Sequence, residues 1–224
     1  MYLKKKEIIK NYLLGDNLDI EVKLERFEIA WDIWENLEDI KKDMRKKVIE
    51  TLLNKIECSE DFKEYEIKDH GLLQGLKWAP LRIYKRNWII SELQEIPLSY
   101  SIEADKNNYF NIFLGIIKWN DKTPFKGSWQ NNTTLDKSMR NLLSRIFEEL
   151  KHTSSRWKVS DWYIAYKPFE SYLFDNWKKE FYLDIIKKGY EYIANCYFRE
   201  ILTMKEKTEK LIDNFIEEYK QKFL

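Results

Sequence analysis

The stretch PLSYSIEADKNNYFNIFLGII, Pro97–Ile117, carries the clearest strand pattern in the chain. Apolar and polar side chains alternate in its first part, in the order Leu98, Ser99, Tyr100, Ser101, Ile102, Glu103 and Ala104. Alternation with a period of two places one set of side chains against a core and leaves the other set in water. Turn residues follow at Asp105–Asn108, and a second apolar run occupies Tyr109–Ile117. The stretch therefore predicts a β-hairpin.

Two further strands flank this hairpin, at Leu81–Tyr84 and Trp162–Tyr166. Thr134 is a candidate N-cap for a helix that runs to Leu150. Pro168 is expected to end the last strand, and a helix is predicted over Glu170–Lys188. These segments predict an α+β fold, in which a small antiparallel β-meander of three to four strands is covered by helices.

Two long amphipathic helices are predicted near the termini. From Ile20 to Ile56, and again from Tyr190 to Tyr219, apolar residues recur every three or four positions. A helix of about 30 residues spans roughly 45 Å, so pairing of the two helices is the economical arrangement. Trp31 and Trp34 fall on the apolar face of the first helix and are expected in the core.

Composition bounds the class of protein. The 224 residues contain 39 Lys and Arg against 38 Asp and Glu, with 44% hydrophobic residues. This near-neutral, aromatic-rich mixture is typical of a folded protein and does not favour nucleic acid or an anionic membrane as a partner. We expect one compact domain over residues 1–224, with a helical part at 1–58 and the meander and C-terminal helices at 59–224. The absence of a signal sequence or long apolar run predicts a cytoplasmic protein with no membrane partner.

The residues that usually carry chemistry are few and scattered. The cysteines are Cys58 and Cys196, the histidines are His70 and His152, and no closely spaced pair of metal ligands exists among them. The sequence also lacks the glycine-rich loops that bind phosphates. We therefore expect no metal, no cofactor and no catalytic residues, and predict that the chain is not an enzyme.

One window of sequence is distinguished by its charge. Between His70 and Ser91 there is no Asp or Glu, and basic and aromatic residues are interleaved. Such a window can contact a protein partner, stack on nucleic acid bases, or be a strand whose tryptophan packs in the core. The candidate partner-binding residues are Arg82, Tyr84, Lys85, Arg86 and Trp88. If the strand continues past residue 84, Arg82, Tyr84, Arg86 and Trp88 form a row on one face.

A resemblance to a known family covers the C-terminal part most closely. The segment AYKPFESYLFDNWKKEFYLDIIKKG, Ala165–Gly189, is followed by Ile193-Ala-Asn and a long helix rich in Lys and Glu. This arrangement resembles the C-terminal, non-catalytic portion of PD-(D/E)XK-superfamily nuclease-like proteins. The strand-borne acid pair and Lys of that superfamily are missing, so the resemblance implies an accessory part and assigns no active-site residue.

These observations give two hypotheses for function. The first is a non-enzymatic protein-binding module, encoded by a phage or mobile element to inhibit a bacterial defence nuclease such as an RNA-guided CRISPR effector. The alternative is a degenerate PD-(D/E)XK nuclease-like protein, or an accessory nuclease domain, that binds DNA or RNA. The neutral total charge favours another protein as the partner and predicts only weak binding of nucleic acid.

Overall fold

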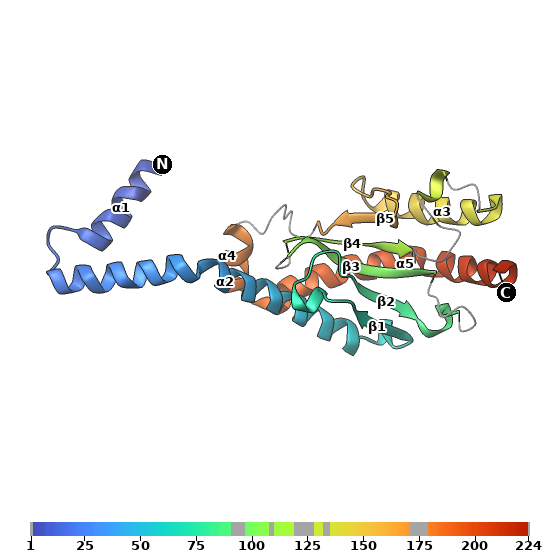
Figure 1. The fold of residues 1–224 in the computed structure, drawn as a ribbon, viewed down its shortest axis with the longest axis horizontal. Helices are drawn as coiled ribbons and strands as arrows, with labels where there is room; N and C mark the ends of the chain where they lie inside the picture. The colour runs from blue at the N-terminus through green and yellow to red at the C-terminus, as the bar shows by residue number, and fades with distance from the viewer. Residues whose placement is uncertain are drawn as a thin grey trace. The chain divides into compact units, whose positions relative to one another are not determined.

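The helices and strands follow the sequence patterns closely. The computed structural model describes residues 2–90, 97–107, 110–118, 128–131, 135–170 and 179–223. The helices are α1 (Tyr2–Leu14), α2 (Ile20–Cys58), α3 (Lys137–Thr153), α4 (Lys179–Lys188) and α5 (Tyr190–Phe223) (Figure 1). The strands are β1 (Tyr65–Asp69), β2 (Leu81–Lys85), β3 (Leu98–Lys106), β4 (Phe110–Lys118) and β5 (Tyr163–Pro168).

The strands form one antiparallel sheet in the order β1-β2-β3-β4-β5. Tyr100 of β3 lies opposite Ile83 of β2 on one side and Ile116 of β4 on the other. The α+β meander is therefore confirmed, with five strands where three to four were predicted. The additional strand is β1, and the tip of the predicted β3–β4 turn lies outside the described residues.

One face of the sheet packs against helices. The side chains on this face include Ile83, Tyr100 and Leu114, which are all buried. The Tyr100 hydroxyl lies 3.3 Å from the hydroxyl of Thr208 on α5, which places α5 along this face. In α3 the buried side chains recur every three or four residues, at Met139, Leu143, Ile146 and Leu150, so α3 presents a continuous apolar stripe to its neighbours.

The opposite face is also buried, which corrects the expectation that it is wet. Ser99, Ser101 and Glu103 are almost completely covered. Rings of neighbouring strands pack on this side, where Phe113 lies 5.5 Å from Tyr163 between ring centroids. Apolar and polar side chains alternate between the two faces of β3 as predicted, but the polar side chains lie among aromatic rings rather than in water.

Helix ends are set by local chemistry. Asp136 is the N-cap of α3, because its carboxylate accepts a hydrogen bond from the Met139 N–H at 2.9 Å. The predicted cap, Thr134, lies outside the described residues, as does 171–178 of the predicted helix Glu170–Lys188. Gly189 separates α4 from α5 with φ +83°, a left-handed conformation that glycine adopts without strain.

The packing divides the chain into two compact units, residues 1–44 and 45–224. This differs from the single compact domain expected from the sequence. The boundary lies inside α2, which is continuous from Ile20 to Cys58. All the buried residues of α2 follow Met44, namely Arg45, Val48, Ile49, Thr51, Leu52 and Ile56. In this later part of α2, Lys55 forms a 2.9 Å ion pair with Glu191 of α5.

Within residues 1–44, α1 and α2 form a helical hairpin. A turn joins them, with the Leu18 N–H donating to the Gly15 carbonyl at 3.1 Å. The Arg26 guanidinium donates to the Tyr12 carbonyl at 2.8 Å and lies 4.5 Å from the centre of the Tyr12 ring. A cation over an aromatic face is attractive, so these contacts hold α1 beside the first turns of α2.

Candidate functional site

The predicted partner-binding window is mostly interior. Arg82, Tyr84, Lys85 and Trp88 are buried, whereas the Arg86 side chain is 75% exposed and pairs with Glu66 at 3.2 Å. The strand ends at Lys85, and residues 86–88 form a short 3-10 helix. The predicted row on one strand face, which required the strand to continue past residue 84, does not extend to Trp88, because this turn directs Trp88 into the core.

Lys85 and Trp88 meet on the same carboxylate of α5. The Lys85 ammonium lies 2.8 Å from Asp213 and 2.7 Å from Glu209, and the Trp88 indole N–H donates to Asp213 at 2.6 Å. The Tyr65 hydroxyl donates to Glu209 at 2.8 Å. The positive charge of Lys85 is thus neutralised by α5, and these groups join β1 and β2 to the last helix.

A second polar cluster lies on the other face of the sheet. The Tyr163 hydroxyl donates a hydrogen bond to the Glu103 carboxylate, and Arg82 is close enough to influence both groups. Burial lowers the pKa of Arg82 to about 10. Burial also raises the pKa of Glu103 above its ordinary value of 4.5, although the bond from Tyr163 and the charge of Arg82 oppose this shift. Glu103 therefore holds its proton more tightly in the folded chain than in the unfolded chain.

We expect Glu103→Gln to change how stability depends on pH. Because the folded-state pKa of Glu103 is raised, its contribution to the free energy of unfolding falls as pH rises from about 4.5 through the folded value. The glutamine still accepts the Tyr163 hydrogen bond but does not ionise. The stability of the wild type relative to the variant should therefore decrease as pH rises above the ordinary value of 4.5, as measured by urea denaturation.

Glu60→Gln is the matched control for this measurement, because the Glu60 side chain is 88% exposed. It should leave the pH dependence of the wild type unchanged. If the wild type keeps a constant stability relative to Glu103→Gln, or gains stability relative to it as pH rises, then folding does not raise the pKa of Glu103.

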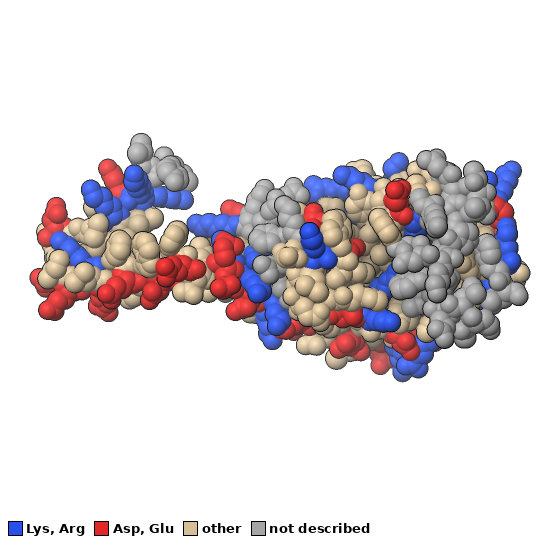
Figure 2. Space-filling model, in the orientation of Figure 1, with Lys and Arg blue, Asp and Glu red and all other residues tan. Residues whose placement is uncertain are grey.

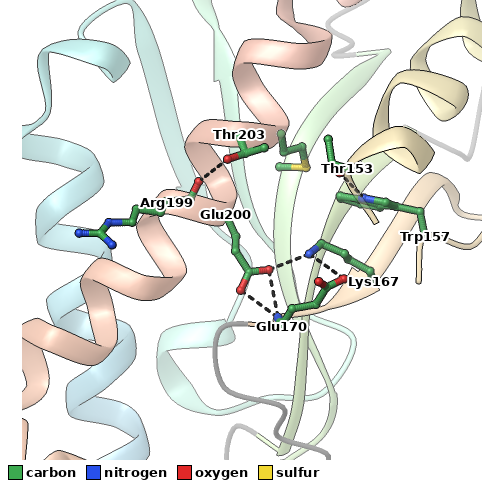
Figure 3. Close-up of a pocket in the computed structure, with 8 residues that line it drawn as sticks. Thr153, Trp157, Lys167, Glu170, Arg199, Glu200 and Thr203 are labelled. Carbon is green, nitrogen blue, oxygen red and sulfur yellow. Dashed lines mark hydrogen bonds and ion pairs between the residues drawn. The ribbon is translucent and has the colours of Figure 1, made fainter. Parts of the chain in front are cut away.

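A pocket of about 330 Å³ lies between β5, α5 and the end of α3 (Figure 3). Lys167 reaches between two carboxylates, at 3.2 Å from Glu170 and 2.8 Å from Glu200. Its ammonium also lies 5.4 Å from the centre of the Trp157 ring. Glu200 accepts the Glu170 backbone N–H at 2.8 Å, while Arg199 points away from this group in Figure 3. Lys167 of β5 is thus held by Glu200 of α5 as well as by Glu170, so the arrangement fastens β5 to α5.

The cysteines and histidines do not come together as a site. Cys58 and Cys196 are both free thiols. Burial raises the pKa of Cys196, which disfavours its thiolate form. Among the described residues, no three His, Cys, Asp or Glu side chains gather closely enough to hold a metal ion.

Exposed apolar surface is concentrated in the 1–44 unit. Trp34 is 68% exposed and Trp31 is 49% exposed, with their ring centroids 5.2 Å apart. This corrects the expectation that the two tryptophans are core residues. Elsewhere, Trp157 is buried and Trp162 is exposed. We define the apolar hairpin surface by the exposed large hydrophobic residues of this unit, which are Ile8, Ile9, Tyr12, Leu14, Ile20, Leu24, Phe27, Ile29, Trp31, Ile33, Trp34, Leu37 and Ile40.

The residues that sequence reasoning missed as functional candidates are therefore the tryptophans of α2. Their three-residue spacing predicted a common helix face correctly. The signal that could have marked them is the breadth of the apolar arc, since Ile29 and Ile33 lie on a different side of the helix from Trp31 and Trp34.

Together the elements define an α+β protein with a five-stranded antiparallel meander, internally paired charges and a helical hairpin rich in exposed apolar side chains. The chain matches no protein-family model, no curated protein and no solved structure. In the described part of the chain, every helix is too short or too polar to cross a membrane.

Proposed function

We propose that the chain is a non-enzymatic protein-binding module whose contact surface is the apolar hairpin surface of residues 1–44. The observation that carries this proposal is the exposure of Trp31 and Trp34 beside other large apolar side chains. Contiguous apolar patches larger than a few hundred Å² mark interaction sites on folded proteins. Tryptophan is also among the residues that contribute most to the energy of protein interfaces.

The interior of the 45–224 unit supports a structural role for its charged groups. Lys85 and Lys167 each lie between two carboxylates from within the same unit. If either lysine left these partners to contact a ligand, the partly buried carboxylates would lose the charge that compensates them, which is costly. The meander and its helices therefore serve the proposed module as a stable body.

The identity of the partner stays a prediction. The hypothesis that it is a bacterial defence nuclease, such as an RNA-guided CRISPR effector, is tested by adding the protein to the cleavage reaction of such an effector. The alternative of a degenerate PD-(D/E)XK-like protein predicts direct binding of DNA or RNA instead. The pairing of Lys85 with Glu209 and Asp213 leaves fewer free cations for phosphates in the predicted window.

Photo-crosslinking tests whether the hairpin surface contacts protein. A photoreactive phenylalanine at position 34, in chains produced in bacterial cells, should form adducts with a protein. The same probe at Trp162 is the control, because Trp162 is similarly exposed but belongs to the 45–224 unit. We expect adducts at position 34 to exceed those at position 162 and to fall when Trp31→Ser is added. Equal labelling at the two positions would contradict the proposal.

A further inference from the structure

We infer that the occupant of the apolar hairpin surface is a second copy of this chain, with α1 of each copy lying against α2 of the other. This inference rests on the proposed function and names its partner. It is carried by three properties of residues 1–44: the breadth of the apolar arc on α2, the opposite charges of α1 and α2, and the area that is exposed.

The apolar arc of α2 is too broad for its own α1 to cover. Phe27, Trp31 and Trp34 lie on one side of the helix, and Ile29 and Ile33 lie on another. The intrachain contact is at Tyr12 and Arg26, and residues 31–40 are exposed throughout. A helix that is apolar over most of its circumference is typical of a buried position. The apolar side chains of α2 that its own α1 leaves exposed therefore require a further partner.

The charges beside the apolar side chains are opposite on the two helices. On α2, Glu28, Glu35 and Glu38 lie three or four residues from Trp31 or Trp34, and are therefore their neighbours on the helix surface. On α1, Lys4 and Lys5 stand in the same relation to Ile8 and Ile9. Figure 2 shows blue side chains on α1 and a row of red side chains along α2.

The net charges follow the same division. Residues 2–14 contain four Lys and one Glu, whereas residues 16–40 contain nine acidic and two basic residues. The uncovered part of α2 therefore fits a basic, apolar helix, and α1 of another copy has this chemistry. A two-fold pairing places each α1 against the other copy's α2, so both complementary contacts form at once and the assembly closes as a dimer.

The exposed area is sufficient for a stable dimer. A fully covered aromatic side chain buries about 150–250 Å², and Phe27, Trp31 and Trp34 are each about half exposed or more. Including the aliphatic members, the apolar hairpin surface offers on the order of 1,000 Å² per copy. A standard protein interface buries about 800 Å² per partner.

Sedimentation analysis of the full chain tests the inference directly. We expect a species of twice the 27.5 kDa chain mass that dissociates on dilution. Trp31→Ser combined with Trp34→Ser should weaken self-association by at least about tenfold, whereas the control Trp162→Ser should leave it unchanged. A wild-type chain that stays monomeric over a hundredfold range of concentration overturns the inference, and so does a dimer that the double variant leaves intact.

Charge reversal provides a test that does not depend on removing apolar side chains. One variant carries Lys4→Glu, Lys5→Glu and Lys10→Glu, and a second carries Glu28→Lys, Glu35→Lys and Glu38→Lys. In a self-pair of either variant the substituted side chains face side chains of the same sign beside the apolar residues, so each variant alone should dimerise more weakly than the wild type. In the mixed pair each set of substituted side chains faces a set of the opposite sign, so mixing should yield a heterodimer. Failure of the mixture to associate, or full dimerisation of either variant alone, overturns the inference.

The outcomes also separate this inference from the proposed function. Adducts at position 34 with a different protein, together with a monomeric wild type, overturn the second copy but retain the binding module. A monomer without excess adducts at position 34 overturns both.

Discussion

Replacing Trp88 with alanine is expected to destabilise the protein by about 3–5 kcal/mol, the usual cost of truncating a buried tryptophan. Trp88 is 1% exposed, and its ring lies 5.5 Å from the Tyr100 ring and 5.8 Å from the Tyr65 ring between centroids. The variant loses this aromatic packing and also the hydrogen bond to Asp213. Urea denaturation of the two proteins at neutral pH measures the difference.

Trp162→Ala is the matched control for Trp88, because it removes the same group from a position that is 53% exposed. Its effect should stay within about 1 kcal/mol, as is usual for surface substitutions. If Trp88→Ala is no more damaging than Trp162→Ala, the indole does not occupy the core described here, and the window of residues 82–88 returns as a candidate surface.

Replacing Lys85 with methionine is expected to cost about 2 kcal/mol at neutral pH. Breaking a fully buried ion pair by removing one partner costs about 3–5 kcal/mol. The effect is smaller here because the Glu209 and Asp213 side chains keep 27% and 31% of their exposure, and water screens their charge. Methionine retains most of the apolar stem, so the loss reports mainly on the ammonium group.

The pH dependence of that loss identifies its origin. Burial acts to raise the pKa of Glu209, but hydrogen bonds from Lys85 and Lys205 lower it below its ordinary value of 4.5. A carboxylate with a lowered pKa contributes stability above the unfolded-state pKa and loses this contribution as pH falls through the folded-state value. The cost of Lys85→Met should therefore be largest near pH 7 and shrink below about pH 4.5.

Lys63→Met serves as the comparison, since Lys63 forms an exposed ion pair with Glu60 at 3.3 Å. Surface pairs contribute about 0–1 kcal/mol, so this variant should unfold at nearly the wild-type urea concentration. A cost of Lys85→Met that is equal at low and neutral pH would mean that the lysine acts through its stem and not through its charge.

Local sequence patterns predicted most of the fold. Alternation located β3 and β4, and periodicity located α2 and α5 to within a few residues. The surroundings of individual side chains could not be predicted in this way. Lys85 is buried because Glu209 and Asp213 approach it from α5, and nothing near residue 85 indicates partners that are more than a hundred positions away.

Trp88 and Trp34 show that the burial of a side chain could not be predicted from the local sequence pattern. Trp88 follows a strand whose extension would have exposed it, but a 3-10 turn at residue 86 reverses its direction. Trp34 continues a periodic apolar face that is buried from residue 45 onward and exposed before it. Periodicity identifies which side chains share a helix face, whereas only the tertiary structure shows which part of that face is buried.

The order of the strands has a consequence for folding during synthesis. The strands β2, β3 and β4 each pair with the strand made immediately before it across a short connection, so hairpins can form while the chain is still growing, and such short-range pairings are the fastest to assemble. The helix that supplies Thr208, Glu209 and Asp213 to this sheet is α5, which is translated after every strand. Until α5 has left the ribosome, the nascent meander lacks these partners for Tyr100 and Lys85, and it is then most vulnerable to aggregation and most dependent on chaperones.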